Sequence, residues 1–173
     1  MIIKSKNIYN GVIIDLDVET VELPNKHVMD MEIVRHPGGS AVVAINSEGE
    51  ICLLKQYRHV MKDWVWEIPA GKIDDNEDPA VTAIRELKEE AGVSAGDWES
   101  LGSFISSPGV FSEVVYLYQA TNLVYQGCEQ EPGEIMERHW LGLDQAYAWV
   151  LDNTIRDGKS IAAITRAYHL NKS

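Results

Sequence analysis

A short stretch in the middle of the chain constrains the fold and the chemistry more than any other part of its 173 residues. Its fixed positions follow the spacing G-x5-E-x7-R-E-U-x-E-E-x-G-U, where U is a bulky aliphatic residue. They are Gly71, Glu77, Arg85, Glu86, Leu87, Glu89, Glu90, Gly92 and Val93. Residues of ordinary abundance do not fall at so many fixed distances by coincidence, so the pattern points to a defined local structure with a defined chemistry.

The local sequence predicts a loop, a helix and a stop. Residues 74–76 are turn formers, and Pro79 fits a first helical position, where its missing N–H costs nothing. Apolar residues then recur at steps of three and four, which predicts a helix with one buried stripe. The stripe consists of Ala80, Ala83, Ile84, Leu87 and Ala91. Gly92 supplies a left-handed stop.

Three carboxylates on this helix lie beside or opposite the stripe. Glu86, Glu89 and Glu90 are three or four residues apart, so they converge over one turn and repel one another. A divalent cation removes this conflict, and oxygen ligands without a nearby Cys or His favour Mg²⁺, with Mn²⁺ as a substitute, over zinc. Glu77 and Arg85 then form a clamp between the loop and the helix. The alternative interpretation is a solvated Glu-rich helix face, which the fixed offsets of the motif disfavour.

Residues 71–93 resemble a complete Nudix box, with no departure at a defining position. The family hydrolyses nucleoside diphosphates linked to another group. The resemblance implies that Glu86, Glu89 and Glu90 are metal-binding or catalytic, and that the backbone carbonyl of Ala70 is a further metal ligand. It implies structural roles for Gly71, Glu77, Arg85 and Gly92.

Segments outside the box indicate which diphosphate is cleaved. Several of them resemble the ADP-ribose pyrophosphatase branch of the family, although hydrolases of GDP-mannose and of other nucleotide sugars share much of the pattern. In the ADP-ribose branch a proline follows the box near the position of Pro108. The similar segments are residues 35–42, 55–58, 66–71, 107–109 and 144–147, so the resemblance spans most of residues 35–168.

The residues that would bind such a substrate follow partly from charge. Because the chain is acidic, its few guanidinium groups are the best candidates to grip phosphate, and Arg35 and Arg58 are so assigned. Glu113 follows the 107–109 loop closely enough to reach a ribose hydroxyl or a metal-bound water. Pro108 and Gly109 complete the substrate-binding set. The alternatives are surface salt bridges for the two arginines and a strand-edge surface charge for Glu113.

An acidic segment with Gly and Pro, residues 129–134, interrupts the chain between a strand and a helical region. It resembles the loop from which ADP-ribose pyrophosphatases bring a glutamate over the bound substrate. We therefore predict Glu134 as the general base or an additional metal ligand, with Glu131 as the second candidate and Glu89 as the alternative within the box. A solvated acidic loop is the competing interpretation.

Composition excludes several classes of partner. With 45% hydrophobic residues, the chain can bury a core as one domain with a small appendage. A formal charge of −12, without a run of Lys or Arg, argues against nucleic acid as a partner. No stretch has the apolar length of a signal peptide or a membrane span. The expected location is the cytoplasm, and no membrane partner is expected.

The pattern along the chain predicts an α+β fold, an α/β/α sandwich of the Nudix type with a mixed β-sheet between helices. Residues 1–36 alternate apolar and polar residues and predict an antiparallel three-stranded sheet for dimerisation or base binding, and residues 37–173 form the hydrolase domain. The strands expected in that domain are 39–46 and 51–57, joined by a hairpin turn at 47–49, then 98–106, 114–123 and 138–141. Helices follow at 144–152, capped by Asp144, and from Gly158 onward.

These features together predict a Mg²⁺-dependent hydrolase that cleaves ADP-ribose to AMP and ribose 5-phosphate. GDP-mannose or another nucleoside diphosphate sugar is the alternative substrate. A non-catalytic module that senses a nucleotide sugar is the alternative from a different class. The N-terminal sheet predicts a homodimer, with that sheet exchanged between the subunits in one version.

Overall fold

The computed structural model describes residues 1–127 and 135–172. The strands in these residues are β1 (Ile2–Asn10), β2 (Asp15–Glu22), β3 (Val28–Arg35), β4 (Gly39–Ala44), β5 (Glu50–Arg58), β6 (Asp63–Glu67), β7 (Ala70–Lys72), β8 (Val93–Ile105), β9 (Val114–Tyr125) and β10 (Met136–Gly142). The helices are α1 (Pro79–Glu86), α2 (Leu143–Leu151) and α3 (Gly158–Lys172), and a π-helical turn, η1 (Leu87–Ala91), continues α1.

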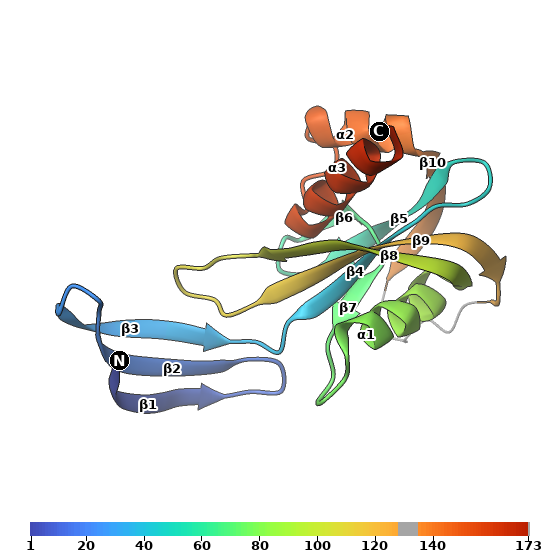
Figure 1. Ribbon diagram of the computed structural model, residues 1–173. Coiled ribbons are helices and arrows are strands. Elements are labelled where there is room, and N and C mark those ends of the chain that lie inside the picture. The colour runs from blue at the N-terminus through green and yellow to red at the C-terminus, as the bar shows by residue number, and fades with distance from the viewer. Residues whose placement is uncertain (128–134, 173) are drawn as a thin grey trace.

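The body of the molecule has three layers. One sheet has the order β7-β4-β9-β8, in which β4 and β9 are parallel and the other pairs antiparallel, and a second sheet has the order β10-β5-β6. Helix α1 lies on one side of these sheets and helices α2 and α3 lie on the other (Figure 1). The predicted α/β/α sandwich is therefore confirmed. Among the helices of the described residues, none has the length and apolar character needed to span a membrane.

Strand β4 shows why two cores form. All six of its residues are buried, because it is covered on both faces. Successive side chains of a strand point to opposite faces. Ala41 and Val43 therefore join the core beneath α2 and α3, whereas Val42 and Ala44 join the core beneath α1. The position of the motif helix is thus set by alternate residues of one central strand.

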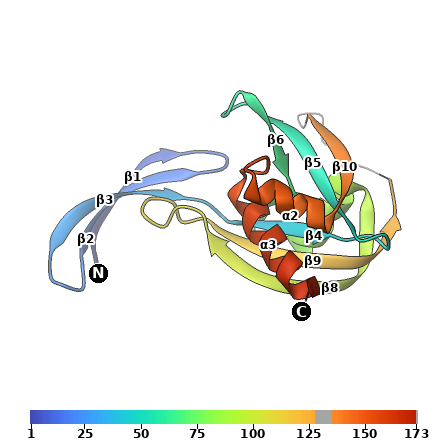
Figure 2. The same ribbon diagram turned by 90° about the horizontal axis from the view of Figure 1, so that it is seen from above.

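The N-terminal sheet has the order β1-β2-β3, is antiparallel throughout and lies beside the body (Figures 1 and 2). The predicted three antiparallel strands are confirmed. Strand β3 also touches the loop between β8 and β9, since the Val34 N–H donates to the Val110 carbonyl at 2.8 Å and the Ser112 N–H donates to the Val34 carbonyl at 2.9 Å. The division into units 1–36 and 37–173 stays a prediction.

The expected hairpin of β4 and β5 is only partly correct. The turn exists, with Gly49 at φ +76° and the Asn46 side-chain oxygen accepting from the Glu48 and Glu50 N–H groups at 2.9 Å. Beyond one bridge between Ile45 and Ile51, however, the strands part and enter different sheets. Both strands are apolar on both faces, so the sequence carries no periodicity that reveals this parting.

The remaining differences from the sequence prediction are local. Strands β6 and β7 were not predicted, because they are short and interrupted by Pro69. Helix α2 begins after Gly142, which makes no side-chain cap hydrogen bond, and Asp144 lies in its first turn rather than at the cap. Helix α3 begins at Gly158, as expected.

Candidate active site

The motif helix begins and ends as its sequence predicts. Asp78 is the N-cap and its carboxylate accepts from the Ala80 N–H at 2.8 Å, while Pro79 occupies the start of the helix. Gly92 ends it at φ +71°. Between these points the backbone changes from α to π geometry over η1. Such π turns recur at functional sites, and this one carries Glu89 and Glu90.

The predicted buried stripe of this helix is partly wrong. Ile84 is 50% exposed, whereas Glu86 and Glu90 are only 8% and 3% exposed. The helix is turned so that the carboxylates of Glu86 and Glu90 face inward toward β7, and the Thr82 hydroxyl helps to hold the loop before the helix by donating to Glu77 at 2.7 Å. The members of the stripe that are buried are Ala83, Leu87 and Ala91.

Arg85 links three carboxylates of the motif. It donates to Glu77 from Nε at 3.2 Å and from Nη2 at 3.0 Å, and from Nη1 to Glu86 at 2.6 Å and Glu89 at 3.2 Å. Hydrogen bonds from Arg85, and then from Thr82, lower the pKa of Glu77 to about 2. The loop is thereby held on the helix, which is what the predicted clamp requires.

The backbone just before and at the start of the box receives two of the carboxylates. The Ala70 N–H donates to Glu90 Oε2 at 2.7 Å. At Gly71, an added Cβ would fall on the carboxylate of Glu86, so a side chain fits there only if Glu86 leaves this position. The positions of both buried glutamates are thus fixed by two consecutive residues of β7.

A cavity of about 560 Å³ opens beside these residues. The sequence-predicted site residues that line it are Ala70, Gly71, Arg85, Glu86, Glu89, Glu90, Arg58 and Glu113. Lining residues that the sequence analysis missed as site residues are His36, Ser40, Gln56, Lys72 and Lys159. The sequence does carry a signal near Lys159, because Asp157 and Gly158 just before it mark the start of a helix.

The structure places three other predicted residues away from the cavity lining. Arg35, at the end of β3, pairs with Glu19 at 2.5 Å and Asp17 at 3.3 Å on the neighbouring strand. Pro108 and Gly109 are exposed on the loop between β8 and β9. Their roles in substrate binding stay predictions.

The predicted general base is not resolved by the geometry. Glu131 and Glu134 lie outside the described residues. Glu89, the alternative, lines the cavity, and its side chain is partly exposed and paired with Arg85. The choice among the three glutamates therefore stays a prediction.

His36 contributes to the wall near Glu113. Its Nδ1 accepts from the Gly38 N–H at 3.1 Å and lies 3.5 Å from the Glu113 carboxylate, and its ring packs on Phe111 at 5.3 Å between centroids. His36 lies in one of the segments that resemble the ADP-ribose branch.

The donor set fits a hard divalent cation. Within the described part of the chain, no group of three or more His, Cys, Asp and Glu residues stands ready to hold an ion. Mg²⁺, however, is usually bound by one or two carboxylates and completed by water and substrate phosphate oxygens. Glu86 and Glu90 supply such a pair, and Ala70, whose carbonyl is the predicted further ligand, lines the same cavity. The residues present therefore suit Mg²⁺ or Mn²⁺.

Known proteins resemble this chain over nearly its whole length. A methanol dehydrogenase activator from Bacillus methanolicus is 40% identical over 166 residues, covering 94% of this chain and 89% of that protein. An ADP-ribose pyrophosphatase from Bacillus subtilis is 38% identical over 164 residues with the same coverage. A GDP-mannose pyrophosphatase from Enterobacter sp. is 27% identical over 151 residues, 75% of this chain and 76% of that protein.

A solved structure shares the fold of this chain, and a family model points to the same family as these relatives. The crystal structure of an ADP compounds hydrolase superposes with a TM-score of 0.85 at 20% identity, covering 99% of this chain and 94% of that one, which establishes the same fold. The model of the NUDIX domain matches residues 35–164. The resemblance seen in the box is thereby confirmed, and the chain belongs to the NUDIX domain family.

Proposed function

We propose that this protein hydrolyses the pyrophosphate bond of ADP-ribose to give AMP and ribose 5-phosphate, with Mg²⁺ as cofactor. The observation that carries the proposal is that buried Glu86 and Glu90 share one cavity with the guanidinium of Arg58. Carboxylates are what a divalent cation needs, and cationic side chains are what the diphosphate needs. The similarity to an ADP-ribose pyrophosphatase supports the choice of substrate.

The side chains divide the work as follows. Glu86, Glu90 and the Ala70 carbonyl would hold Mg²⁺, with Glu134 as the predicted additional ligand. When bound, the ion neutralises charge on the phosphate oxygens and makes water a better nucleophile. Arg58 presents N–H donors to the phosphate oxygens. Glu134, with Glu131 and Glu89 as alternatives, would take the proton of the attacking water.

A substrate panel tests this proposal directly. With Mg²⁺, we expect kcat/KM for ADP-ribose to exceed that for GDP-mannose by about tenfold or more. Chelation should abolish turnover, and added Mn²⁺ should restore part of it, because the site is built from oxygen ligands. Product analysis should show AMP and ribose 5-phosphate. Faster cleavage of GDP-mannose, or turnover that survives thorough chelation, would contradict the proposal.

A second candidate function belongs to a different class. The relative named as a methanol dehydrogenase activator favours a role in which the protein acts through a partner enzyme. A purely sensing module would bind ADP-ribose without cleaving it. Binding measured by calorimetry, together with the absence of turnover of every compound in the panel with Mg²⁺ or Mn²⁺, would favour that candidate. A cytoplasmic location stays a prediction.

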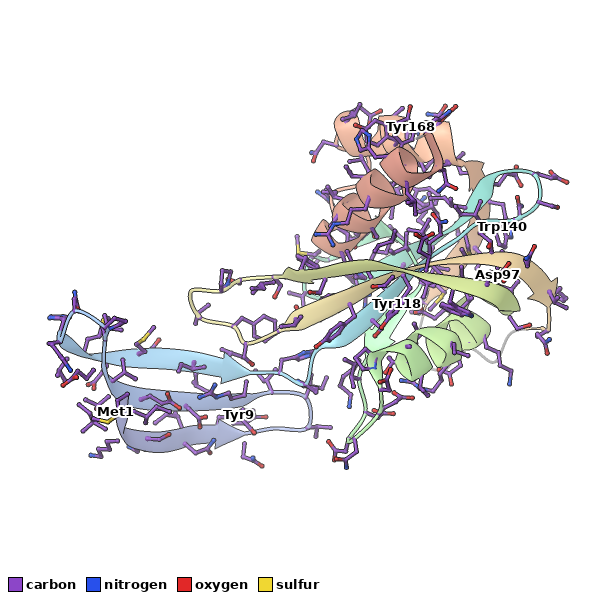
Figure 3. All side chains as sticks on the ribbon, viewed as in Figure 1. Met1, Tyr9, Asp97, Tyr118, Trp140 and Tyr168 are labelled. Carbon is purple, nitrogen blue, oxygen red and sulfur yellow. The ribbon has the colours of Figure 1, made fainter. Side chains whose placement is uncertain are left out.

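We also propose a homodimer formed through the N-terminal sheet. Strand β1 is exposed along its whole length, and Figure 3 shows Met1 and Tyr9 on this sheet, away from the body. A three-stranded sheet is marginal by itself, and monomers seldom expose so many large apolar residues together. The exposed apolar residues of the sheet and its turn are Met1, Ile2, Ile3, Ile8, Tyr9, Val12, Ile13, Val28 and Met29. Ile13 also lines the cavity, so pairing of sheets would change the site.

Light scattering tests the dimer. The wild type should have twice the mass of the 19.4 kDa chain at assay concentrations. The double variant Ile3→Asp/Ile8→Asp should be a monomer, because unpaired charges would be buried in the interface. Val81→Asp is the matched control, since Val81 is an exposed apolar residue of α1, outside the N-terminal sheet. A monomeric wild type would refute the dimer and any sharing of residues between sites.

A further inference from the structure

A group of charged side chains ties two strands to a helix beside the cavity. Arg58 of β5 donates from Nε and Nη2 to the two carboxylate oxygens of Glu67 on β6, each at 2.7 Å. Lys159, at the start of α3, donates to the same Glu67 oxygen that receives Nη2, and to Asp157 at 3.0 Å. Arg58, Glu67 and Lys159 are called the charge cluster below.

The charge cluster stands where two cavities meet. Arg58 and Lys159 line the cavity of about 560 Å³ and also a second one of about 610 Å³. The second cavity is lined by apolar residues such as Val60, Met61 and Phe104, and also by charged residues, Arg156 and Asp157 among them. A compound with negative charge at its middle and a bulky group at each end suits this arrangement, because the cations lie between two spaces that each accept one end.

All three members of the charge cluster are ionised. Burial raises the pKa of Glu67, but the hydrogen bonds from Arg58 and the attraction of Lys159 outweigh it and lower that pKa to about 2. Burial lowers the pKa of Lys159, but the attraction of Asp157 and Glu67 outweighs it and raises that pKa. Two cations therefore share the buried Glu67 carboxylate. Each of them helps to fix the orientation of the carboxylate that the other one binds.

The two cations differ in what they can reach. A guanidinium has five N–H donors, of which Glu67 engages two, and the Arg58 side chain is 43% exposed. The Lys159 side chain is 16% exposed and its ammonium is held between two carboxylates. Arg58 is thus placed to touch a phosphate, whereas the Lys159 ammonium is engaged by two carboxylates and acts on the one that it shares with Arg58.

We propose that Lys159 is a positioning residue for the hydrolysis: by fixing the Glu67 carboxylate, it holds the Arg58 guanidinium in the orientation that meets the substrate phosphates at the junction of the two cavities. This inference rests on the proposed function. It explains why Lys159 and its neighbour Ser160 are anchored together, since Ser160 Oγ donates to Asp157 at 2.6 Å and accepts from the Ile68 N–H at 2.9 Å. The start of α3 is thereby locked to β6 and to the residues that follow it.

Kinetics of Lys159→Met, Lys159→Arg and Arg58→Lys test the inference. Lys159→Met should raise KM for ADP-ribose about tenfold and leave kcat within about threefold, because the lost contact binds ground state and transition state alike. Lys159→Arg should recover most of the affinity, since it keeps a cation on Glu67. Lys172→Met is the matched control; Lys172 forms an exposed ion pair with Asp144 at the other end of α3, and its loss should leave KM unchanged.

A double variant separates positioning from an independent or purely structural role. If Lys159 acts through Arg58, Lys159→Met should add less than about twofold to KM in the Arg58→Lys background. The inference would be overturned if the increases in KM of the two single variants multiplied in the double variant, or if Lys159→Met left KM unchanged. Urea unfolding verifies that each variant is folded. If the wild type prefers another compound of the panel, the variants are compared on that compound. If the wild type binds ADP-ribose without cleaving it, the dissociation constant Kd is measured in place of KM. Failure of the substrate assignment is thus distinguished from failure of the inference.

Discussion

Glu90→Gln should lower kcat/KM for ADP-ribose by about 100- to 1,000-fold. Glutamine has nearly the same size and keeps an oxygen that can accept from the Ala70 N–H, so the 2.7 Å bond and the fold can survive. What disappears is a buried negative charge at the proposed metal site. The effect should therefore appear mainly in kcat and in the Mg²⁺ concentration needed for half-maximal rate, measured by steady-state kinetics at several metal concentrations.

The control for this variant is Glu99→Gln, which removes the same charge from an exposed position on β8. It should change kcat/KM by less than about twofold, because surface charges contribute little locally. If Glu90→Gln is as active as Glu99→Gln, the buried carboxylate has no part in the reaction and the proposed metal site is wrong.

Gly71→Ala should lower kcat/KM about 100-fold while the protein remains folded. The added methyl group would occupy the place of the Glu86 carboxylate, which must then leave its position beside the cavity. Because the obstacle is the end of a flexible side chain, the protein can relax by moving Glu86, at a cost of about 1–3 kcal/mol in unfolding free energy. Activity and urea unfolding, measured on the same preparation, separate the two effects.

Gly142→Ala is the matched control, since a Cβ at Gly142 meets nothing within 4 Å and its φ of −53° suits any residue. It should retain full activity. Retention of activity by Gly71→Ala as well would mean that the Glu86 carboxylate need not stand where the structure places it.

The motif was the part of the site most readable from sequence. The Pro79 start and the Gly92 stop follow from local chemistry that the sequence shows, whereas the cap at Asp78 was not predicted. The rotation of the helix does not, because Ile84 fits an apolar stripe as well as Ala83 does. Only the packing of the helix against β4 and β7 decides that Glu86 is covered and Ile84 is left exposed. The spacing of apolar residues predicts that the helix has a buried face, but tertiary contacts decide which residues lie on it.

The cationic part of the site shows a different limit. Arg58 was selected by charge type and lines the cavity, but Arg35 was selected by the same reasoning and pairs with Asp17 and Glu19. Lys159 was missed, since it lies about 100 residues beyond Arg58 and meets it only through Glu67. Sequence names the available cations, whereas the partners that each one finds depend on the fold.

The backbone link between β3 and the β8–β9 loop has a consequence for regulation. Val34 is hydrogen-bonded to that loop through both its N–H and its carbonyl, and Glu113, which lines the cavity, directly follows Ser112. If two chains associate through the N-terminal sheet as proposed, a shift of β3 would be passed through these two hydrogen bonds to the loop that leads to Glu113. Catalytic efficiency would then rise or fall with protein concentration, and dilution alone would act as a switch on affinity for the nucleotide.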